Sequence, residues 1–255
     1  TPFMEQIGAF TLFDKQSMKV AKIYDIHLES RRLLKLGHPW ITADSYSLKF
    51  PQELKLLEIM DEKQSFGFFL HDPKHPKIKA RFWSKTLPNL NQDIKVRVER
   101  AIKKREALTL KRDNFYLVFA EADELPGLYI QKLGEFLLVQ YQAFFWEEKK
   151  RLLQSLLNDI GERKIWWQAR LPAEQKLAPT TSENLPNEFI IKEDELSFLI
   201  KMNQGHDIGI YTDMSAIRNQ IKEYFKPQKK LLNLFSYTGA FSLLGLHHGM
   251  EVCSV

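Results

Sequence analysis

From Gly205 onward, the sequence alternates between helical and extended segments in an order that few folds accept. We expect an apolar strand at 230–235, a polar turn at 236–240, a helix at 241–248 and a second strand at 251–255. Strand, turn, helix and strand in this order open a doubly wound α/β domain, in which ligands bind beyond the carboxyl ends of the strands. The turn at 236–240 is therefore the expected ligand position.

This turn contains one glycine, Gly239. It lacks the three-glycine spacing of dinucleotide-binding folds and the Gly-Lys-Ser/Thr end of a phosphate loop, which argues against NAD and ATP. A glycine still lets a ligand approach the backbone closely, and the hydroxyls of Ser236, Tyr237 and Thr238 surround it. The pattern suits a nucleotide without phosphates, such as S-adenosylmethionine. The alternative is that Gly239 only eases a tight turn.

The positive charge of the chain is concentrated in one stretch. The 255 residues include 37 Lys and Arg and 32 Asp and Glu, a net charge of +5, and residues 95–112 alone contain eight basic and two acidic side chains. Residues 71–85 interleave five further basic side chains with aromatic ones. Basic stripes bind polyanions and aromatic rings stack on bases, so both stretches favour RNA as a partner. The alternative for the stripe is a solvated helix face.

Composition limits the other classes of protein. No apolar run approaches the roughly 20 residues that a membrane-spanning helix needs, and no cluster has the spacing of metal ligands. Cys253 is the only cysteine, which excludes an internal disulfide and a four-cysteine zinc site. A reducing cytoplasm is therefore the expected location. Because Cys253 lies in an apolar strand, we predict a buried thiol that acts as a small hydrophobic side chain.

The chain divides into three expected parts, which makes the fold class α+β and α/β multi-domain. Residues 1–88 form a small β-rich unit, residues 89–200 a linker helix with a strand-rich α+β unit, and residues 201–255 the first part of the α/β domain. Strands are also expected at 23–28, 66–70, 78–83, 116–119, 128–131, 136–141, 164–168, 189–192 and 196–200, and helices at 29–36, 94–108, 145–160 and 213–224.

Four segments, in order along the chain, resemble motifs of the large-subunit (23S) rRNA methyltransferases that make 5-methylcytosine. Residues 37–41 resemble their His-Pro-Trp segment, and 121–128 resemble their Glu-Ala-Asp-Gly-Leu-Pro-Gly-Leu. Residues 205–219 and 231–242 resemble Gly-Gln-x-Thr-Gly-Phe-Phe-x-Asp-Gln-Arg and Asp-Leu-Phe-x-Tyr-Thr-Gly-Gly-Phe-Ser. The resemblance implies a PUA-like β barrel, a middle α+β domain and a Rossmann-like, class I S-adenosylmethionine-dependent methyltransferase domain.

The turn and the resemblance together select the expected binding residues. Those for the cofactor are Tyr211, Asp213, Ser215, Asn233, Phe235, Ser236, Tyr237, Thr238 and Gly239. The alternative roles are core packing for Tyr211 and Phe235, and a helix cap for Asp213. Those for RNA are His38, Trp40, Lys77, Lys79, Arg81, Arg97, Arg100, Lys104 and Arg105. His38 and Trp40 have packing of the small domain as their alternative.

The chain departs from the family pattern at two places. Asn233 replaces an acidic residue, and Met214-Ser215 replaces Gln-Arg. The nucleophilic cysteine that this resemblance implies would lie beyond Val255, so we expect no catalytic residue within this chain and a truncated piece of a longer protein. A thiolate that attacks C6 of cytosine is the covalent catalyst that C5 methylation needs.

The leading hypothesis is an S-adenosylmethionine-dependent RNA methyltransferase that acts on cytosine C5 of rRNA. Its expected partner is RNA, without a membrane, and dimerisation is common in the family that it resembles. The first alternative is a non-catalytic RNA-binding protein with a degenerate methyltransferase domain. The second is a methyltransferase of a small molecule, in which the basic stripe would have no role.

Overall fold

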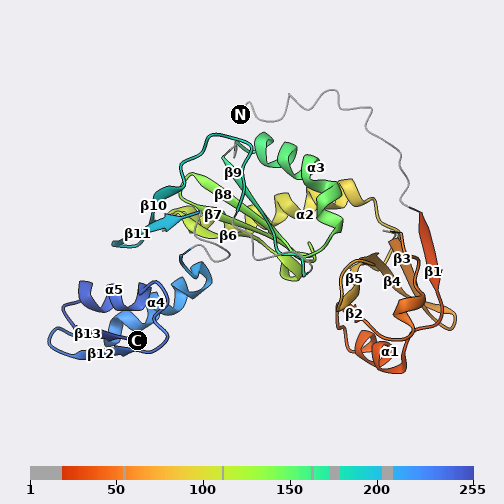
Figure 1. Ribbon diagram of the computed structural model, residues 1–255, viewed down its shortest axis with the longest axis horizontal. Coiled ribbons are helices and arrows are strands. Elements are labelled where there is room, and N and C mark those ends of the chain that lie inside the picture. The colour runs from red at the N-terminus through yellow and green to blue at the C-terminus, as the bar shows by residue number, and fades with distance from the viewer. Residues whose placement is uncertain (1–18, 54–55, 111, 162–163, 173–178, 203–208) are drawn as a thin grey trace.

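A computed structural model describes residues 19–53, 56–110, 112–161, 164–172, 179–202 and 209–255. Three units follow one another in an arch, with the middle unit at its top and the N-terminal and C-terminal units at its two ends (Figure 1). None of the helices among these residues combines the length and the apolar character needed to cross a membrane.

The N-terminal unit is a five-stranded sheet in the order β1-β3-β4-β5-β2. Its strands are β1 (Val20–Ile23), β2 (Trp40–Thr42), β3 (Leu56–Asp61), β4 (Gln64–His71) and β5 (Ile78–Ser84), with helix α1 (Leu28–Lys35) and the 3-10 turn η1 (Ser47–Lys49) between them. β1 runs parallel to β3, and the other neighbours are antiparallel. The expected barrel is not found, because the described strands leave β1 and β2 as separate edges of an open sheet.

The middle unit is a four-stranded sheet in the order β6-β7-β8-β9 with two helices on one face. Its elements are α2 (Leu90–Arg105), η2 (Glu106–Leu110), β6 (Asn114–Phe119), η3 (Ala120–Asp123), β7 (Leu128–Leu133), β8 (Phe136–Tyr141), α3 (Phe145–Asp159) and β9 (Ile165–Ala169). The helix and hairpin predictions for this region are confirmed. Ile94 and Val98 of α2 and Leu153 and Leu157 of α3 pack on the sheet in the largest core of the protein.

A second hairpin covers one end of the opposite sheet face. β10 (Glu188–Glu193) and β11 (Leu196–Lys201) are antiparallel. Ile191 and Ile200 of this hairpin share a buried cluster with Leu138 and Trp166 of the sheet.

The C-terminal unit has the predicted strand–turn–helix–strand order. It comprises η4 (Thr212–Met214), α4 (Ser215–Ile221), η5 (Lys222–Tyr224), β12 (Lys230–Asn233), α5 (Ala240–His247) and β13 (Glu251–Ser254). β12 and β13 are parallel and are connected through α5, as in a βαβ unit. The single helix expected at 213–224 is instead one short α-helix between two 3-10 turns.

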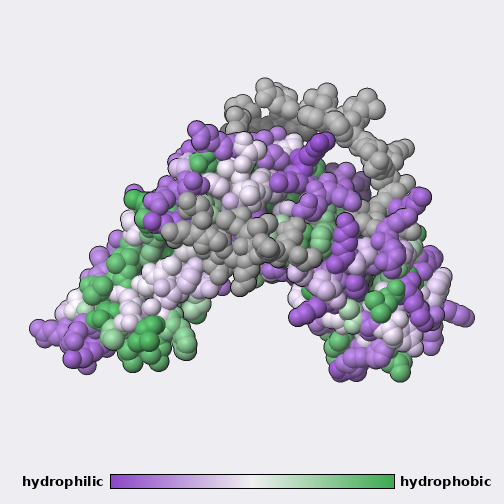
Figure 2. All heavy atoms as spheres, viewed as in Figure 1, coloured by the Kyte–Doolittle hydropathy of each residue, from purple (hydrophilic) through white to green (hydrophobic). Residues whose placement is uncertain are grey.

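The prediction of a buried Cys253 is wrong. Its thiol is exposed, because Cys253 pairs with Leu232 in the two-stranded sheet and Leu232 is itself 60% exposed. In the view of Figure 2, apolar side chains gather on the C-terminal unit, where Leu232, Leu234 and Leu246 are exposed. The N-terminal unit also exposes single leucines, among them Leu28 and Leu36.

Candidate functional site

The turn after β12 has an unusual backbone. Phe235, Tyr237 and Gly239 adopt positive φ angles of 59°, 51° and 80°. Non-glycine residues seldom adopt such angles, and clusters of them occur at ligand sites. The Gly239 amide donates to the Ser236 carbonyl at 2.8 Å, and α5 begins at the next residue. The result is a tight, strained turn at the carboxyl end of a parallel strand, where α/β sheets bind ligands.

A segment that precedes α4 is tied to this turn. The Gly209 amide donates to the Tyr237 hydroxyl at 3.0 Å, and the Thr238 hydroxyl donates to the Gly209 carbonyl. The ring of Tyr211 lies 4.9 Å from that of Tyr237. The structure thus brings Tyr211 together with the turn residues, as expected, and both rings are about half exposed.

The remaining cofactor candidates have different surroundings. Asn233 donates its side-chain amide to the Ser242 hydroxyl at 2.8 Å, and Ser242 is hydrogen-bonded to Ser254. Asn233 therefore joins the turn to α5 and β13. Asp213 is exposed in η4. Ser215, at the start of α4, is only 5% exposed, so its hydroxyl is not accessible to a ligand that binds from solvent.

The backbone of Gly239 is not crowded by the described residues around it. A Cβ atom at this position would meet only Ser242, at 3.9 Å, so the space in front of the glycine is open. Phe235 is 96% exposed and offers an apolar face to an aromatic base. An uncharged nucleoside fits this combination of open backbone, hydroxyls and apolar rings.

Two arginines predicted to bind RNA are buried, which corrects their assignment. Arg81 is 1% exposed and donates to the Gln142 carbonyl at 3.1 Å. Arg97 lies 4.2 Å from the centre of the Trp83 ring and donates to the carbonyls of Trp83 and Glu124. Burial lowers the pKa of both guanidinium groups. Both side chains connect the N-terminal and middle units and have no surface to offer a phosphate.

Part of the basic stripe on α2 is also paired within the protein. Arg105 donates to both carboxylate oxygens of Asp123 at 3.0 and 2.7 Å, and Arg100 lies 2.9 Å from a Glu124 oxygen. Lys104 lies 3.9 Å from Asp123. Arg105 is therefore a structural residue, whereas Arg100 and Lys104, with side chains 55% and 64% exposed, can still reach a polyanion.

Among the RNA-binding candidates of the N-terminal unit, some side chains are exposed and others are bonded within the protein. Lys77 is exposed, and Lys79 donates to the Pro73 carbonyl at 3.0 Å. Trp40 donates its indole N–H to Glu121 at 2.8 Å, and Nδ1 of His38 lies 3.1 Å from the Trp40 carbonyl oxygen. Trp40 thus contacts the middle unit through Glu121, and the side chains of His38 and Trp40 are both partly exposed.

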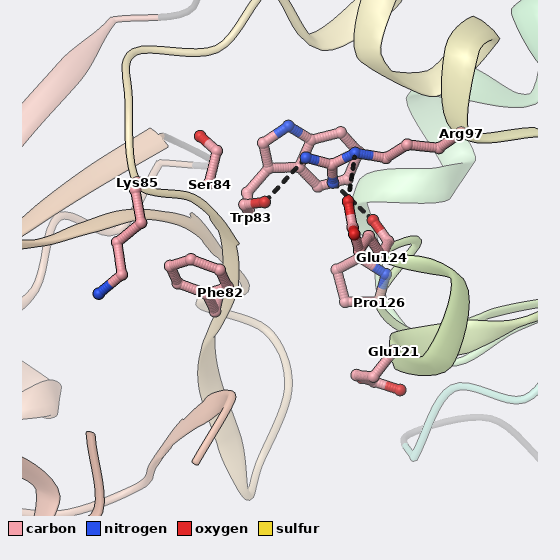
Figure 3. Close-up of a pocket in the computed structure, with 8 residues that line it drawn as sticks. All are labelled: Phe82, Trp83, Ser84, Lys85, Arg97, Glu121, Glu124 and Pro126. Carbon is pink, nitrogen blue, oxygen red and sulfur yellow. Dashed lines mark hydrogen bonds and ion pairs between the residues drawn. The ribbon is translucent and has the colours of Figure 1, made fainter. Parts of the chain in front are cut away.

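A cavity of about 380 Å³ lies where the N-terminal and middle units meet (Figure 3). Arg97 crosses it above Trp83 and reaches Glu124, and Lys85 and Glu121 lie at its edges. Two basic and two acidic side chains line the cavity, so its formal charges cancel. The lining residues are Phe82, Trp83, Ser84, Lys85, Arg97, Glu121, Glu124 and Pro126.

The sequence reasoning missed a group of three aromatic side chains on the middle sheet. The ring centres of Tyr116 and Phe119 are 4.9 Å apart, those of Phe119 and Tyr129 5.3 Å, and those of Tyr116 and Tyr129 6.2 Å. Burial, followed by the charge of Asp213, raises the pKa of Tyr116 to about 12, and burial raises that of Tyr129. Both hydroxyls therefore stay neutral at physiological pH.

Comparison with solved structures decides the fold. A protein described as an S-adenosylmethionine-dependent methyltransferase from Streptococcus mutans has a TM-score of 0.76 at 21% identity, over 91% of this chain and 62% of the other. A methyltransferase crystallised with S-adenosylhomocysteine has a TM-score of 0.77 at 19% identity, over 93% of this chain and 62% of the other. This chain therefore shares its fold with the matched 62% of each of these two proteins.

Sequence comparison finds relatives named as ribosomal RNA large subunit methyltransferases. The ribosomal RNA large subunit methyltransferase I of Vibrio cholerae serotype O1 is 30% identical over 233 residues. The protein of the same name from Escherichia coli K12 is 29% identical over 235 residues. Each match covers 86% of this chain, and the chain spans 58% of the length of these relatives. No protein-family model matches the chain.

Proposed function

We propose that the protein is an S-adenosylmethionine-dependent methyltransferase of large-subunit rRNA, with C5 of a cytosine as the target atom. The observation that carries the proposal is the strained turn after β12, in which Gly239 has open space in front of it at the carboxyl end of a parallel strand. The names of the sequence relatives support rRNA as the substrate class. The choice of cytosine C5 rests on the motif resemblance.

Different residues around the turn would contact different parts of the cofactor. The backbone at Gly239 allows close approach of the ligand, and Phe235 supplies an apolar wall for the adenine. The Tyr211 and Tyr237 rings, with the hydroxyls of Ser236 and Thr238, border the same space. Asn233 holds the base of the turn through Ser242. When bound, S-adenosylmethionine supplies an activated methyl group on its sulfonium sulfur.

The RNA would lie across the N-terminal and middle units. We assign residues 1–88 as the PUA-like RNA-binding unit, 89–200 as the middle unit and 201–255 as part of the methyltransferase unit. The exposed basic side chains Lys77, Arg100 and Lys104 remain the candidates for phosphate contacts. Such contacts make affinity fall with rising salt, because bound counterions are released.

Gly239→Ala tests the cofactor site. Because a Cβ atom would occupy the open space in front of the turn, we expect the dissociation constant of S-adenosylhomocysteine to rise about 30-fold, which is about 2 kcal/mol. Isothermal titration calorimetry on the intact protein measures it.

The matched control for Gly239→Ala is Gly249→Ala. Gly249 also has a positive φ angle, 74°, but it lies just after the far end of α5, beside Pro227. Both variants carry a similar backbone strain, and only the first should lose affinity. Equal losses in the two variants would contradict the assigned site. Absence of wild-type binding at millimolar ligand would favour the non-catalytic RNA-binding protein.

A further inference from the structure

The middle sheet carries three partly exposed aromatic side chains at one end of one face. α2 and α3 cover its inner face, and the β10–β11 hairpin covers the outer face over Leu138 and Trp166. At the other end of that outer face lie Tyr116, Phe119 and Tyr129, which we call the aromatic platform. Phe119 is 39% exposed, and the two tyrosines are partly exposed.

A β-bulge creates the platform. In a regular strand, residues 116 and 119 would point to opposite faces. The register between β6 and β7 shifts between Tyr116 and Val118, so that Tyr116 is opposite Gln131 and Phe119 is opposite Tyr129. Leu117 and Val118 both point into the inner core, and this leaves Tyr116 and Phe119 together on the outer face. Bulges that re-aim side chains are common next to functional sites.

The charges around the platform are nearly balanced. Glu121 accepts a hydrogen bond from Trp40 and lies 3.5 Å from Arg81, so its carboxylate is already compensated. Asp213 and Arg170 both lie close enough to Tyr116 to shift its pKa, in opposite directions. A surface of neutral rings without excess positive charge suits the flat face of a base better than a phosphate group.

The platform continues toward the candidate cofactor turn. Gln131, which lies opposite Tyr116, donates to the hydroxyl of Thr212 at 3.1 Å. The neighbouring residue, Tyr211, has its ring centre 4.9 Å from that of Tyr237 in the turn. Aromatic side chains therefore lead from the middle sheet to the place where the methyl donor would lie. A nucleic acid strand that stacks on the sheet would be held beside that turn.

We propose that the aromatic platform of Tyr116, Phe119 and Tyr129 stacks one or two unpaired bases of the RNA substrate. The proposal rests on the proposed function to the extent that it requires an RNA ligand. Four-stranded sheets with helices on one face and exposed aromatic rings on the other bind single-stranded RNA in this way. Stacking is tolerant of sequence, so the platform holds the strand, while other residues select the target.

Phe119→Leu tests the platform with little risk to the fold, because Phe119 is on the surface and leucine retains most of its apolar volume. The probe is a single-stranded oligouridylate RNA with one central 2-aminopurine, followed by fluorescence anisotropy and by emission of the 2-aminopurine. We expect about tenfold weaker binding, within the range for loss of one stacked base, and loss of the emission change. Phe119→Tyr should restore both, because it keeps the ring.

Two controls separate stacking from other causes. Tyr224→Leu removes a ring that is 77% exposed in η5, and it should bind the RNA as the wild type does. Inorganic polyphosphate should bind Phe119→Leu and the wild type equally, because it has no bases. Tyr129→Leu provides a second platform variant, with thermal unfolding followed by circular dichroism to verify the fold.

The outcomes distinguish this proposal from the proposed function. If the wild type binds the RNA and both Phe119→Leu and Tyr129→Leu bind it equally well, the platform is overturned and the proposed function stands. If folded wild-type protein binds no RNA at physiological salt, both are overturned. An equal loss of polyphosphate binding in Phe119→Leu would also overturn base stacking as the explanation.

Discussion

Replacement of Arg218 by methionine is expected to lower the free energy of unfolding by about 3–5 kcal/mol, the cost of leaving a buried charge without its partner. Arg218 of α4 donates to both carboxylate oxygens of Glu193 in β10, at 2.6 and 2.8 Å, and both side chains are almost fully buried. It also donates to the Tyr211 carbonyl at 3.1 Å. Loss of the arginine leaves Glu193 charged and buried between the middle and C-terminal units.

Urea unfolding followed by circular dichroism measures this effect. The matched control is Lys222→Met, which removes a lysine from the same helical region that pairs with the partly exposed Asp194 and Glu195. Solvent reaches this group and screens its charges more than it does the buried pair of Arg218 and Glu193, so the control should lose less stability than Arg218→Met. The double variant Arg218→Met with Glu193→Leu should recover part of the loss, because no charge is then buried. An Arg218→Met loss below 1 kcal/mol would refute the role of this pair.

Arg97→Met is expected to lower the free energy of unfolding by about 2–4 kcal/mol. The variant loses the contact with the Trp83 ring at 4.2 Å and leaves the carbonyls of Trp83 and Glu124 without their donor. The bond to the Trp83 carbonyl is buried, and a buried group left unsatisfied costs about 1–3 kcal/mol. Loss of the ring contact adds to this cost. Arg97 lies at the contact between the N-terminal and middle units. Without it, we also expect the two units to unfold less cooperatively.

Arg100→Met is the matched control for Arg97→Met. Arg100 pairs with the same Glu124, at 2.9 Å, but its side chain is 55% exposed. Its loss should therefore cost less than about 1 kcal/mol. Equal destabilisation by the two substitutions would show that Arg97 is a surface residue after all, and would return it to the set of RNA-binding candidates. Thermal unfolding of both variants side by side provides the measurement.

The comparison between these two arginines explains what the sequence could not predict. Counting charges shows a positive stretch at 95–112, but it does not show where the opposing acids lie. Asp123 and Glu124 follow about 20 residues later and fold back onto α2 through η3. A charge stripe is therefore a weak predictor of a binding surface when acidic residues lie within one loop of it.

The C-terminal unit was predicted in more detail because its signals are local. The turn residues between 235 and 239 lie next to one another in the chain, so the strand, turn and helix could be placed from sequence alone. The open sheet of the N-terminal unit could not, because β1 pairs with β3 across more than thirty residues of chain. The aromatic platform also escaped prediction, since it depends on the bulge in β6 that shifts the alternation between Tyr116 and Phe119.

The central claim is that the protein transfers a methyl group from S-adenosylmethionine to large-subunit rRNA. The most direct test incubates the full-length protein, rather than residues 1–255 alone, with tritiated S-adenosylmethionine and protein-free large-subunit rRNA, then digests the RNA to nucleosides and separates them. We predict tritium in 5-methylcytidine. Recovery of unlabelled RNA, from a protein shown to bind both S-adenosylhomocysteine and rRNA, would contradict the claim.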